Sequence, residues 1–154
     1  MSLNLTDKDV DDLISLSKML LKKHEINVST PNKGTIPINS LESTDKFCLD
    51  YFVRPGKASL NYREMTYNYS LIRINLNKGF HKNADNVKVE GNRINVFSNT
   101  EFQDKADLKT HTKSYPLPYL GFDDTSDVEV QLIKLLEYTN TNYHNKLNIS
   151  SNLV

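Results

Sequence analysis

The sequence predicts an α+β fold, in which an antiparallel sheet of about five strands packs against two amphipathic helices near the ends of the chain. Three observations predict it. Apolar residues recur at helical spacing in residues 6–24 and 126–140. The middle of the chain alternates apolar and polar residues, as strands with one buried face do. Glycine and proline separate the alternating runs and indicate turns between strands.

The first predicted helix covers residues 6–24. Thr6 is a suitable N-cap, and the acidic residues that follow it favour the positive end of the helix dipole. Lys22, Lys23 and His24 close the segment where cations are favourable. The apolar stripe that we expect to face the sheet is Val10, Leu13, Ile14, Leu20 and Leu21.

The second predicted helix covers residues 126–140 and begins after Asp124, Thr125 or Ser126, each of which is a suitable N-cap. Its apolar residues recur every three to four positions, which places them on one face. The predicted buried stripe is Val128, Leu132, Leu135 and Leu136.

Strands are predicted in the middle of the chain. Residues 46–54 are rich in aromatic and β-branched residues and precede a Pro-Gly turn. Residues 59–68 and 69–76 continue the pattern as a meander. Residues 36–38, which contain a proline, suit an edge strand. Residues 99–122 are polar and proline-rich, and we expect them to be irregular.

A tight hairpin is predicted near residues 86–98, because Gly91-Asn92 separates two alternating segments. In this register Ile94 and Val96 face the core. Arg93 and Asn95 then lie on the opposite face, which we expect to be exposed, so that Asn95→Ala leaves stability nearly unchanged.

Length and charge limit the organisation and the function of the chain. The 154 residues predict one domain over residues 1–145, followed by a frayed tail over 146–154. Lys plus Arg equals Asp plus Glu at 19 each, so the formal net charge is zero. Proteins dedicated to duplex DNA usually have a basic excess, and zero net charge predicts weak binding to it at physiological salt. A net charge near zero also favours self-association, and a homodimer joined along an exposed edge strand is one possibility.

Several classes of site and location are disfavoured by the sequence. A single cysteine, Cys48, excludes an intrachain disulfide and a cysteine-rich zinc site, and we expect it to be a buried small apolar residue. A nucleotide-binding glycine loop, a nucleophile elbow and an HExxH motif are missing, and we predict neither a cofactor nor a metal. No apolar run approaches the ~20 residues of a membrane helix, which predicts a cytoplasmic protein without a membrane partner.

Residues 81–85 are the first candidate for a chemical site. His81, Asn83 and Asp85 alternate, so that their side chains project to the same side if the segment is extended. An imidazole, an amide and a carboxylate can position a water or a hard cation. The alternative is a polar loop whose Asn and Asp side chains bond their own backbone.

Three arginines on successive strands are the second candidate. Arg54, Arg63 and Arg73 converge into an anion-binding face if these strands pair. The alternative is a solvated sheet face with ion pairs to Asp50 and Glu64. Tyrosines and phenylalanine in the same region suit single-stranded nucleic acid, or simple packing between strands.

The middle of the chain resembles a family of small, uncharacterised bacterial and phage proteins that is classified as a domain of unknown function. The family pattern runs from an arginine-bearing aromatic strand through His-x-Asn-Pro-Asp-Gly to a His-x-His-x-Tyr strand and a Pro-Leu segment. The resemblance covers roughly residues 47–120. Ala84 and Asn86 replace the Pro and Gly, and Arg93 and Asn95 replace both histidines of the His-x-His strand.

Together these patterns predict a non-catalytic binding or interaction protein, and the resemblance implies a phage or mobile-element origin. Its partner is an unidentified protein or nucleic acid. The alternative is a phosphodiester-cleaving enzyme that uses His81 as a general base with Arg73 or Arg93 stabilising anionic charge. The residues predicted to face the ligand are Arg73, His81, Asn83, Asp85, Arg93 and Asn95.

Overall fold

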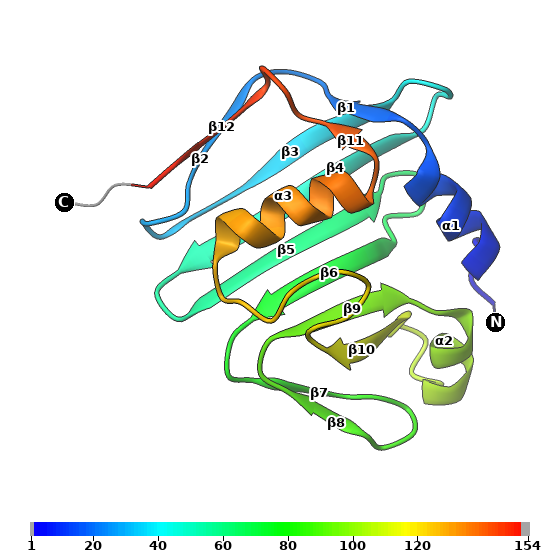
Figure 1. Cartoon of the computed structure of the whole chain (residues 1–154). Coiled ribbons are helices and arrows are strands. Elements are labelled where there is room, and N and C mark those ends of the chain that lie inside the picture. The colour runs from blue at the N-terminus through cyan, green and yellow to red at the C-terminus, as the bar shows by residue number, and fades with distance from the viewer. Residues whose placement is uncertain (1, 152–154) are drawn as a thin grey trace.

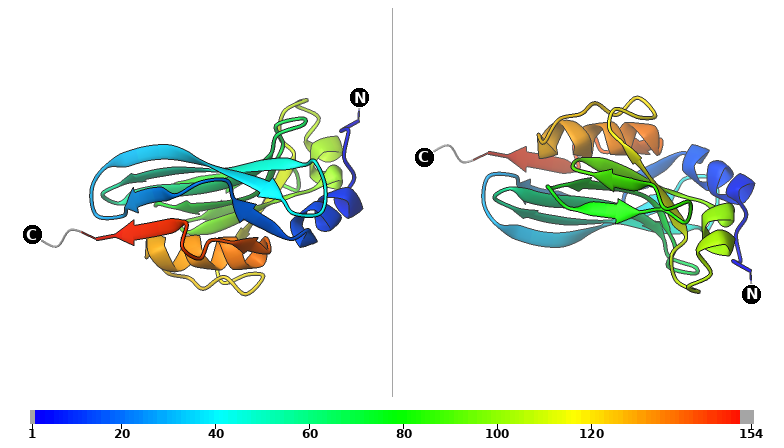
Figure 2. Two further views of the ribbon diagram at one scale, coloured as in Figure 1. Left: turned by 90° about the horizontal axis from the view of Figure 1, so that it is seen from above. Right: turned by 90° about the horizontal axis from the view of Figure 1, so that it is seen from below.

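The computed structural model describes residues 2–151 and has an α+β architecture, as the sequence predicts. One large sheet forms the body of the protein, and helix α3 packs across one of its faces (Figure 1). Helices α1 and α2 lie at one end of the strands (Figures 1 and 2). The helices are α1 (Asp7–Ser15), α2 (Asn99–Lys105) and α3 (Val128–Tyr138).

The main sheet has eight strands rather than about five, in the order β10-β9-β6-β5-β4-β3-β1-β11. All neighbouring pairs are antiparallel except β1 with β11. The main-sheet strands are β1 (Lys18–Leu20), β3 (Asn32–Ser40), β4 (Lys46–Arg54), β5 (Lys57–Glu64), β6 (Ser70–Leu76), β9 (Arg93–Phe97), β10 (Thr112–Pro116) and β11 (Thr141–Asn142).

Two small sheets accompany the main one. Strands β7 (Phe80–Lys82) and β8 (Lys88–Glu90) form an antiparallel hairpin. Strands β2 (His24–Asn27) and β12 (Leu147–Ser150) pair in parallel. Part of the segment 146–154, which the sequence predicts as a frayed tail, is therefore a paired strand, and its last three residues lie outside the described part of the chain.

The N-terminal helix is much shorter than its apolar spacing predicts. A capping box between Thr6 and Asp9 starts it as expected, but it ends at Ser15. Lys18–Leu20 is instead a strand that pairs with β3, and Leu20 is fully buried in it. Pairing with β3 on one side and β11 on the other overrides the weak helical preference of this segment.

Helix α3 confirms the second predicted helix. Its N-cap is Asp127, one position beyond the three predicted caps, and Leu132, Leu135 and Leu136 are fully buried. The hydroxyl of Tyr62 on β5 bonds Thr141 just after α3, and therefore the side of the sheet that carries Tyr62 faces this helix.

The predicted hairpin between residues 86 and 98 is wrong. Strand β9 pairs with β6 on one side and with β10 on the other, so it has no free edge for β8. Strand β8 turns back and pairs with β7. Gly91 does have the positive φ expected of a turn, +77°, but this turn links the small hairpin to the main sheet.

Two further segments differ from expectation. The region predicted to be irregular, 99–122, contains α2 and the edge strand β10. Strand β3 is longer than the predicted 36–38, and Pro37 lies where β3 extends past its pairing with β1. The expected edge strand is wrong, because β3 lies between β4 and β1, and the Pro37 carbonyl still accepts from the Leu21 N–H at 3.1 Å. No helix among residues 2–151 is long and apolar enough to span a membrane.

Candidate functional site

The β7–β8 hairpin supplies His81 and Asn83 to the candidate site. His81 lies opposite Val89 in the hairpin register, and Val89 is buried, so these two side chains share the inner side. Phe80 and Lys88 are on the outer side, where the Lys88 ammonium lies 4.1 Å from the Phe80 ring centroid. The hairpin therefore presents its histidine to the protein and its exposed aromatic ring to solvent.

Asn83 attaches the hairpin to the edge of the main sheet. Its side-chain amide donates to the Ser114 carbonyl and accepts from the Ser114 N–H, both at 2.9 Å. The Asn83 amide therefore satisfies the backbone N–H and C=O of Ser114, which would otherwise be open to pairing with another strand. The next residue, Ala84, donates its N–H to the buried Glu101 of α2 at 2.8 Å, and the Lys105 ammonium donates to the Lys82 carbonyl at 2.6 Å.

Arg93 and Asn95 are buried, at 6% and 5% exposure, which corrects the expectation that they are exposed. The predicted alternation is right, because Ile94 between them is fully buried toward the core. The opposite face is not solvated here, because Arg93 lies against Asn77 and Gly91 at the base of the hairpin and is close enough for its charge to act on His81 of the hairpin. Burial and the charge of Arg73 both lower the pKa of Arg93.

Three buried polar atoms without a hydrogen-bond partner occur together in this region. They are the Nε2 of His81, the Nε of Arg93 and the Oγ of Ser114. Arg93 does use its Nη1 atom, which donates to Asn77 and to the carbonyl of Gly91. Within residues 2–151 it forms no salt bridge with a carboxylate.

Burial also lowers the pKa of His81, and the nearby charge of Lys105 adds to this effect. Glu101 opposes the shift, and Arg93 lowers the pKa further. The balance favours a neutral imidazole at neutral pH. His81 is therefore close enough to Glu101 and Lys105 on α2 and to Arg93 on β9 for their charges to act on it.

Four of the six predicted site residues meet in this cluster, and the other two, Asp85 and Arg73, are exposed beside it. Asp85 is exposed at the hairpin turn, where it accepts from the Val87 N–H as a turn residue commonly does. Its carboxylate is 4.0 Å from the Lys113 ammonium. Arg73 is exposed on β6, although it is directly opposite Asn95 in the strand register.

The side of the main sheet opposite α3 is a continuous polar face. The strand registers align Asp50, Asn61, Arg73, Asn95 and Ser114 in one row from β4 to β10. We call the part on β3–β6 the open half and the part on β9–β10 the covered half. Figure 2 shows α3 on one side of the sheet and no helix across the other.

The open half is strongly basic. Asp50 is its only acidic residue, and it is already bonded to Arg63 at 2.6 Å and to Thr35 at 2.7 Å. Burial raises the pKa of Asp50, but these two hydrogen bonds and the charges of Arg63 and Arg73 together hold it below its ordinary value. The basic residues that the registers place on the open half are Lys33, Lys46, Arg54, Lys57, Arg63 and Arg73.

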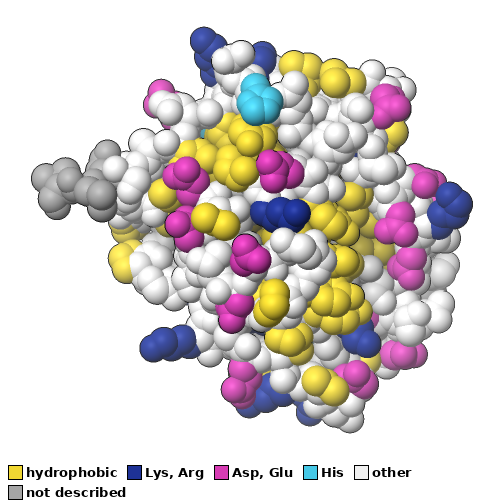
Figure 3. All heavy atoms as spheres, viewed as in Figure 1, with side chains coloured by type: hydrophobic (Ala, Val, Ile, Leu, Met, Phe, Trp, Pro, Cys, Tyr) yellow, Lys and Arg dark blue, Asp and Glu magenta, His cyan; other side chains and the backbone are white. Residues whose placement is uncertain are grey.

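Acidic residues instead gather on α1, at one end of the strands, and on α3 with the segment before it, on the other face of the sheet. Helix α1 carries four aspartates and one lysine, and residues 123–137 carry five acidic residues and one lysine. Figure 3, viewed from the α3 side, shows acidic side chains around these helices. The zero net charge therefore conceals a local separation of charge between the basic open half and these acidic segments.

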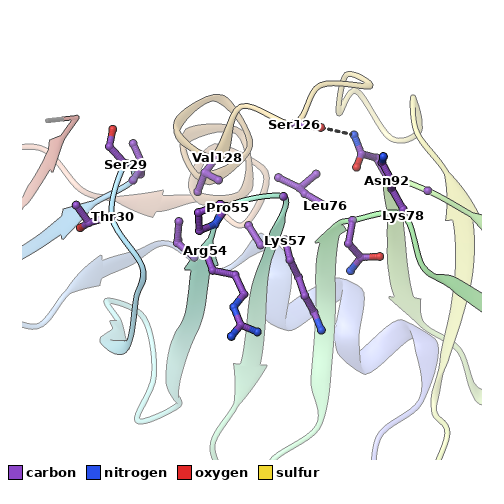
Figure 4. Close-up of a pocket in the computed structure, with 16 residues that line it drawn as sticks. Ser29, Thr30, Arg54, Pro55, Lys57, Leu76, Lys78, Asn92, Ser126 and Val128 are labelled. Atoms are coloured by element: carbon purple, nitrogen blue, oxygen red, sulfur yellow. Dashed lines mark hydrogen bonds between the residues drawn. The ribbon is translucent and has the colours of Figure 1, made fainter. Parts of the chain in front are cut away.

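A cavity of about 620 Å³ lies at the end of the sheet beside the start of α3. Its apolar wall includes Val53, Leu76 and Val128. Arg54 and Lys57 are on its rim, but their side chains extend away from Val128 (Figure 4). These two cations therefore belong to the polar face of the sheet rather than to the cavity.

Sequence reasoning missed Glu101 and Ser114, because both lie in the segment predicted to be irregular. No local sequence pattern distinguishes these two residues, and their role follows from their hydrogen bonds to Ala84 and Asn83 of the hairpin. Among the described residues, no group of three or more His, Cys, Asp or Glu is placed to hold a metal.

A family model described as a family of unknown function, DUF6978, matches residues 5–141. The chain belongs to this family. Its matched region includes the whole polar face and the hairpin that lies against it. No curated protein and no solved structure matches the chain.

Proposed function

We propose that this DUF6978 protein is a non-catalytic binding protein whose open half binds the phosphate backbone of nucleic acid. The observation that carries the proposal is the segregation of charge, with six basic residues and one acidic residue on the uncovered sheet face. Phosphate neutralisation by Lys and Arg supplies most of the affinity of nucleic-acid binding without sequence specificity. The phage or mobile-element origin implied by the resemblance stays a prediction.

The arrangement of the cations fits a repeating polyanion. Arg54, Arg63 and Arg73 come from three neighbouring strands, which lie about 4.8 Å apart in a sheet. Three strand intervals across β3–β6 thus spread the charge over roughly 14 Å. A broad, flat array of this kind suits a chain of phosphates better than a single small anion, which needs converging donors.

The chemistry of the face favours backbone contacts over base recognition. Phe52 is half-buried there, and the Arg54 guanidinium lies 5.3 Å from its ring centroid. The ring is therefore already stacked by a cation and is a poor platform for a base. We expect binding that depends on charge and salt but little on sequence.

The non-catalytic part of the proposal is supported by the surroundings of His81. A general base must lie within hydrogen-bond reach of an acidic or nucleophilic partner or of the substrate. The Nε2 atom of His81 is buried, and it bonds no group among residues 2–151.

Fluorescence anisotropy with a labelled oligonucleotide of about 20 nucleotides tests the proposal. We expect the wild-type protein to bind with a dissociation constant of about 1–100 µM, and more weakly as salt rises. Arg73→Glu should weaken binding about tenfold or more. The matched control is Lys8→Glu on α1, which should leave binding unchanged.

Single-stranded and duplex forms of the same sequence distinguish the two sources of phosphate backbone, and binding of either supports the proposal. Equal binding to polyglutamate would contradict it, because any polyanion would then suffice. Loss of affinity in Lys8→Glu as large as in Arg73→Glu would also contradict it. If the protein self-associates as its concentration rises and does not bind the oligonucleotide, the basic face is a self-association surface instead.

A further inference from the structure

We propose that the β7–β8 hairpin is a displaceable cover over a second phosphate subsite formed by Arg93 and Ser114. The proposal rests on the nucleic-acid function of the open half. The covered half continues the same polar face, since Arg93 is opposite Asn75 and Asn95 is opposite Arg73. Lifting the hairpin would therefore expose Arg93 and add one cation to the basic array of the open half.

The groups under the hairpin have the chemistry of an incomplete anion site. Arg93 is nine-tenths buried, has no carboxylate partner among residues 2–151, and leaves its Nε without a hydrogen bond. Ser114 is also buried, and its Oγ has no partner. A guanidinium and a hydroxyl on neighbouring strands are both donors to phosphate oxygens.

The hairpin is attached in a way that permits release. Its apolar contribution to the protein is Val89, whereas Phe80 and Val87 are 56% and 54% exposed. The polar attachment consists of the hydrogen bonds made by Asn83, Ala84 and Lys82, together with the partly exposed ion pair at 4.0 Å between Asp85 and Lys113 of β10. Segments with little buried apolar surface open at low free energy compared with the core.

Like charge and unpaired polar atoms weaken the closed state further. The buried guanidinium of Arg93 is close enough to Arg73 for the two charges to affect each other. His81 faces the same interface from the hairpin side, and its Nε2 is unpartnered. A phosphate entering beside Arg93 would neutralise a cation that has no carboxylate partner among residues 2–151.

The test compares two valines of the same hairpin. Val89→Ala removes the buried apolar contact, and Val87→Ala makes the same chemical change at an exposed position. Affinity for the labelled oligonucleotide of about 20 nucleotides is measured across salt concentrations. Val89→Ala should bind about tenfold more tightly, with a salt slope steeper by about one, while Val87→Ala should match the wild type.

The gain should require the guanidinium. In the double variant Val89→Ala/Arg93→Gln, both affinity and salt slope should return to wild-type values. Asn83→Ala, which releases the hairpin from Ser114, should reproduce the gain and covers the case in which Val89→Ala does not fold. If Val89→Ala and Asn83→Ala both bind the oligonucleotide with wild-type affinity and salt slope, the proposal that the hairpin is a cover is wrong. The proposed binding by the open half would be unaffected by that result. If instead the proposed function is wrong, Arg73→Glu will not change the affinity for the oligonucleotide.

Discussion

The open and covered halves of the polar face have the same chemistry and opposite exposure. Asn75 on β6 is opposite Arg93 on β9, and Arg73 is opposite Asn95. On both strands these polar residues alternate with apolar residues that face the core. Arg73 is in solvent, whereas Arg93 and Asn95 are buried. The contrast shows that polar alternation defines a face but not its exposure, which depends on what packs over it.

The two halves also use their charges differently. In the open half, Asp50 partly balances Arg63, and the remaining cations are solvated. In the covered half, the Arg93 guanidinium bonds the uncharged groups of Asn77 and Gly91 and no carboxylate among residues 2–151. A buried cation without a carboxylate is costly, and binding sites commonly store such strain.

The largest expected effect separates the two sides of strand β9. Ile94→Ala should lower the free energy of unfolding by ~2–5 kcal/mol, because Ile94 is fully buried toward α3 and the change leaves a cavity. Urea denaturation measures it. A loss below about 1 kcal/mol would mean that the core does not continue to β9.

A smaller effect separates the two halves of the polar face. Asn95→Ala should cost about 1 kcal/mol, because this buried amide donates to the Arg73 carbonyl. Asn75→Ala is the matched control in the open half and should change stability by less than about half a kcal/mol. Equal losses in urea denaturation would show that the hairpin does not distinguish the halves.

Acid should weaken the covered half alone. Burial and Lys105 lower the pKa of His81 in the folded protein, so the unfolded state binds the proton more readily. The neutral form supports the closed hairpin above the ordinary pKa of about 6.5, and this support is lost as the pH falls through the lowered folded-state value.

Hydrogen exchange of the β7–β8 amides, corrected for intrinsic rates, checks the pH effect. Protection should be constant above about pH 6.5 and should fall as the pH is lowered below it, relative to the amides of β4, and His81→Asn should remove the difference. Protection that stays constant in the wild type would indicate that protonation of His81 is not coupled to the hairpin.

The smallest expected effect concerns the one carboxylate of the open half. Asp50→Asn removes the negative charge beside Arg63 and should tighten oligonucleotide binding about two- to threefold. Stability should change by less than about 1 kcal/mol, because the pair is partly exposed. Asp12→Asn on α1 is the control, and an equal gain there would point to global charge rather than to this face.

The sequence was sufficient for the elements whose local pattern agrees with their packing. Helix α3, strands β4–β6 and the inward position of Ile94 were all predicted from spacing and alternation. Helix α1 was predicted too long, because Leu20 continues its apolar spacing but belongs to a strand. In this segment, pairing with the distant strand β3 outweighs the local preference for helix.

The candidate site was predicted only in part, for a related reason. His81, Asn83, Arg93 and Asn95 do meet, but the expected exposed surface is an interface with the hairpin. The pairing of β8 with β7 instead of β9 created this cover, and no local signal in the sequence opposes the Gly91-Asn92 turn. Segregation of charge between sheet and helices likewise depends on strand register, which composition does not contain.

Acetylation of lysines with and without the oligonucleotide, read by mass spectrometry, tests the central claim most directly. Bound nucleic acid should protect Lys33, Lys46 and Lys57 on the open half, and should leave Lys8 on α1 as reactive as before. Lys105, which bonds the hairpin carbonyl of Lys82, should become more reactive if the hairpin lifts. Protection of Lys8 equal to that of Lys57, or no protection of Lys33, Lys46 and Lys57, would contradict the assignment of the open half as the binding face.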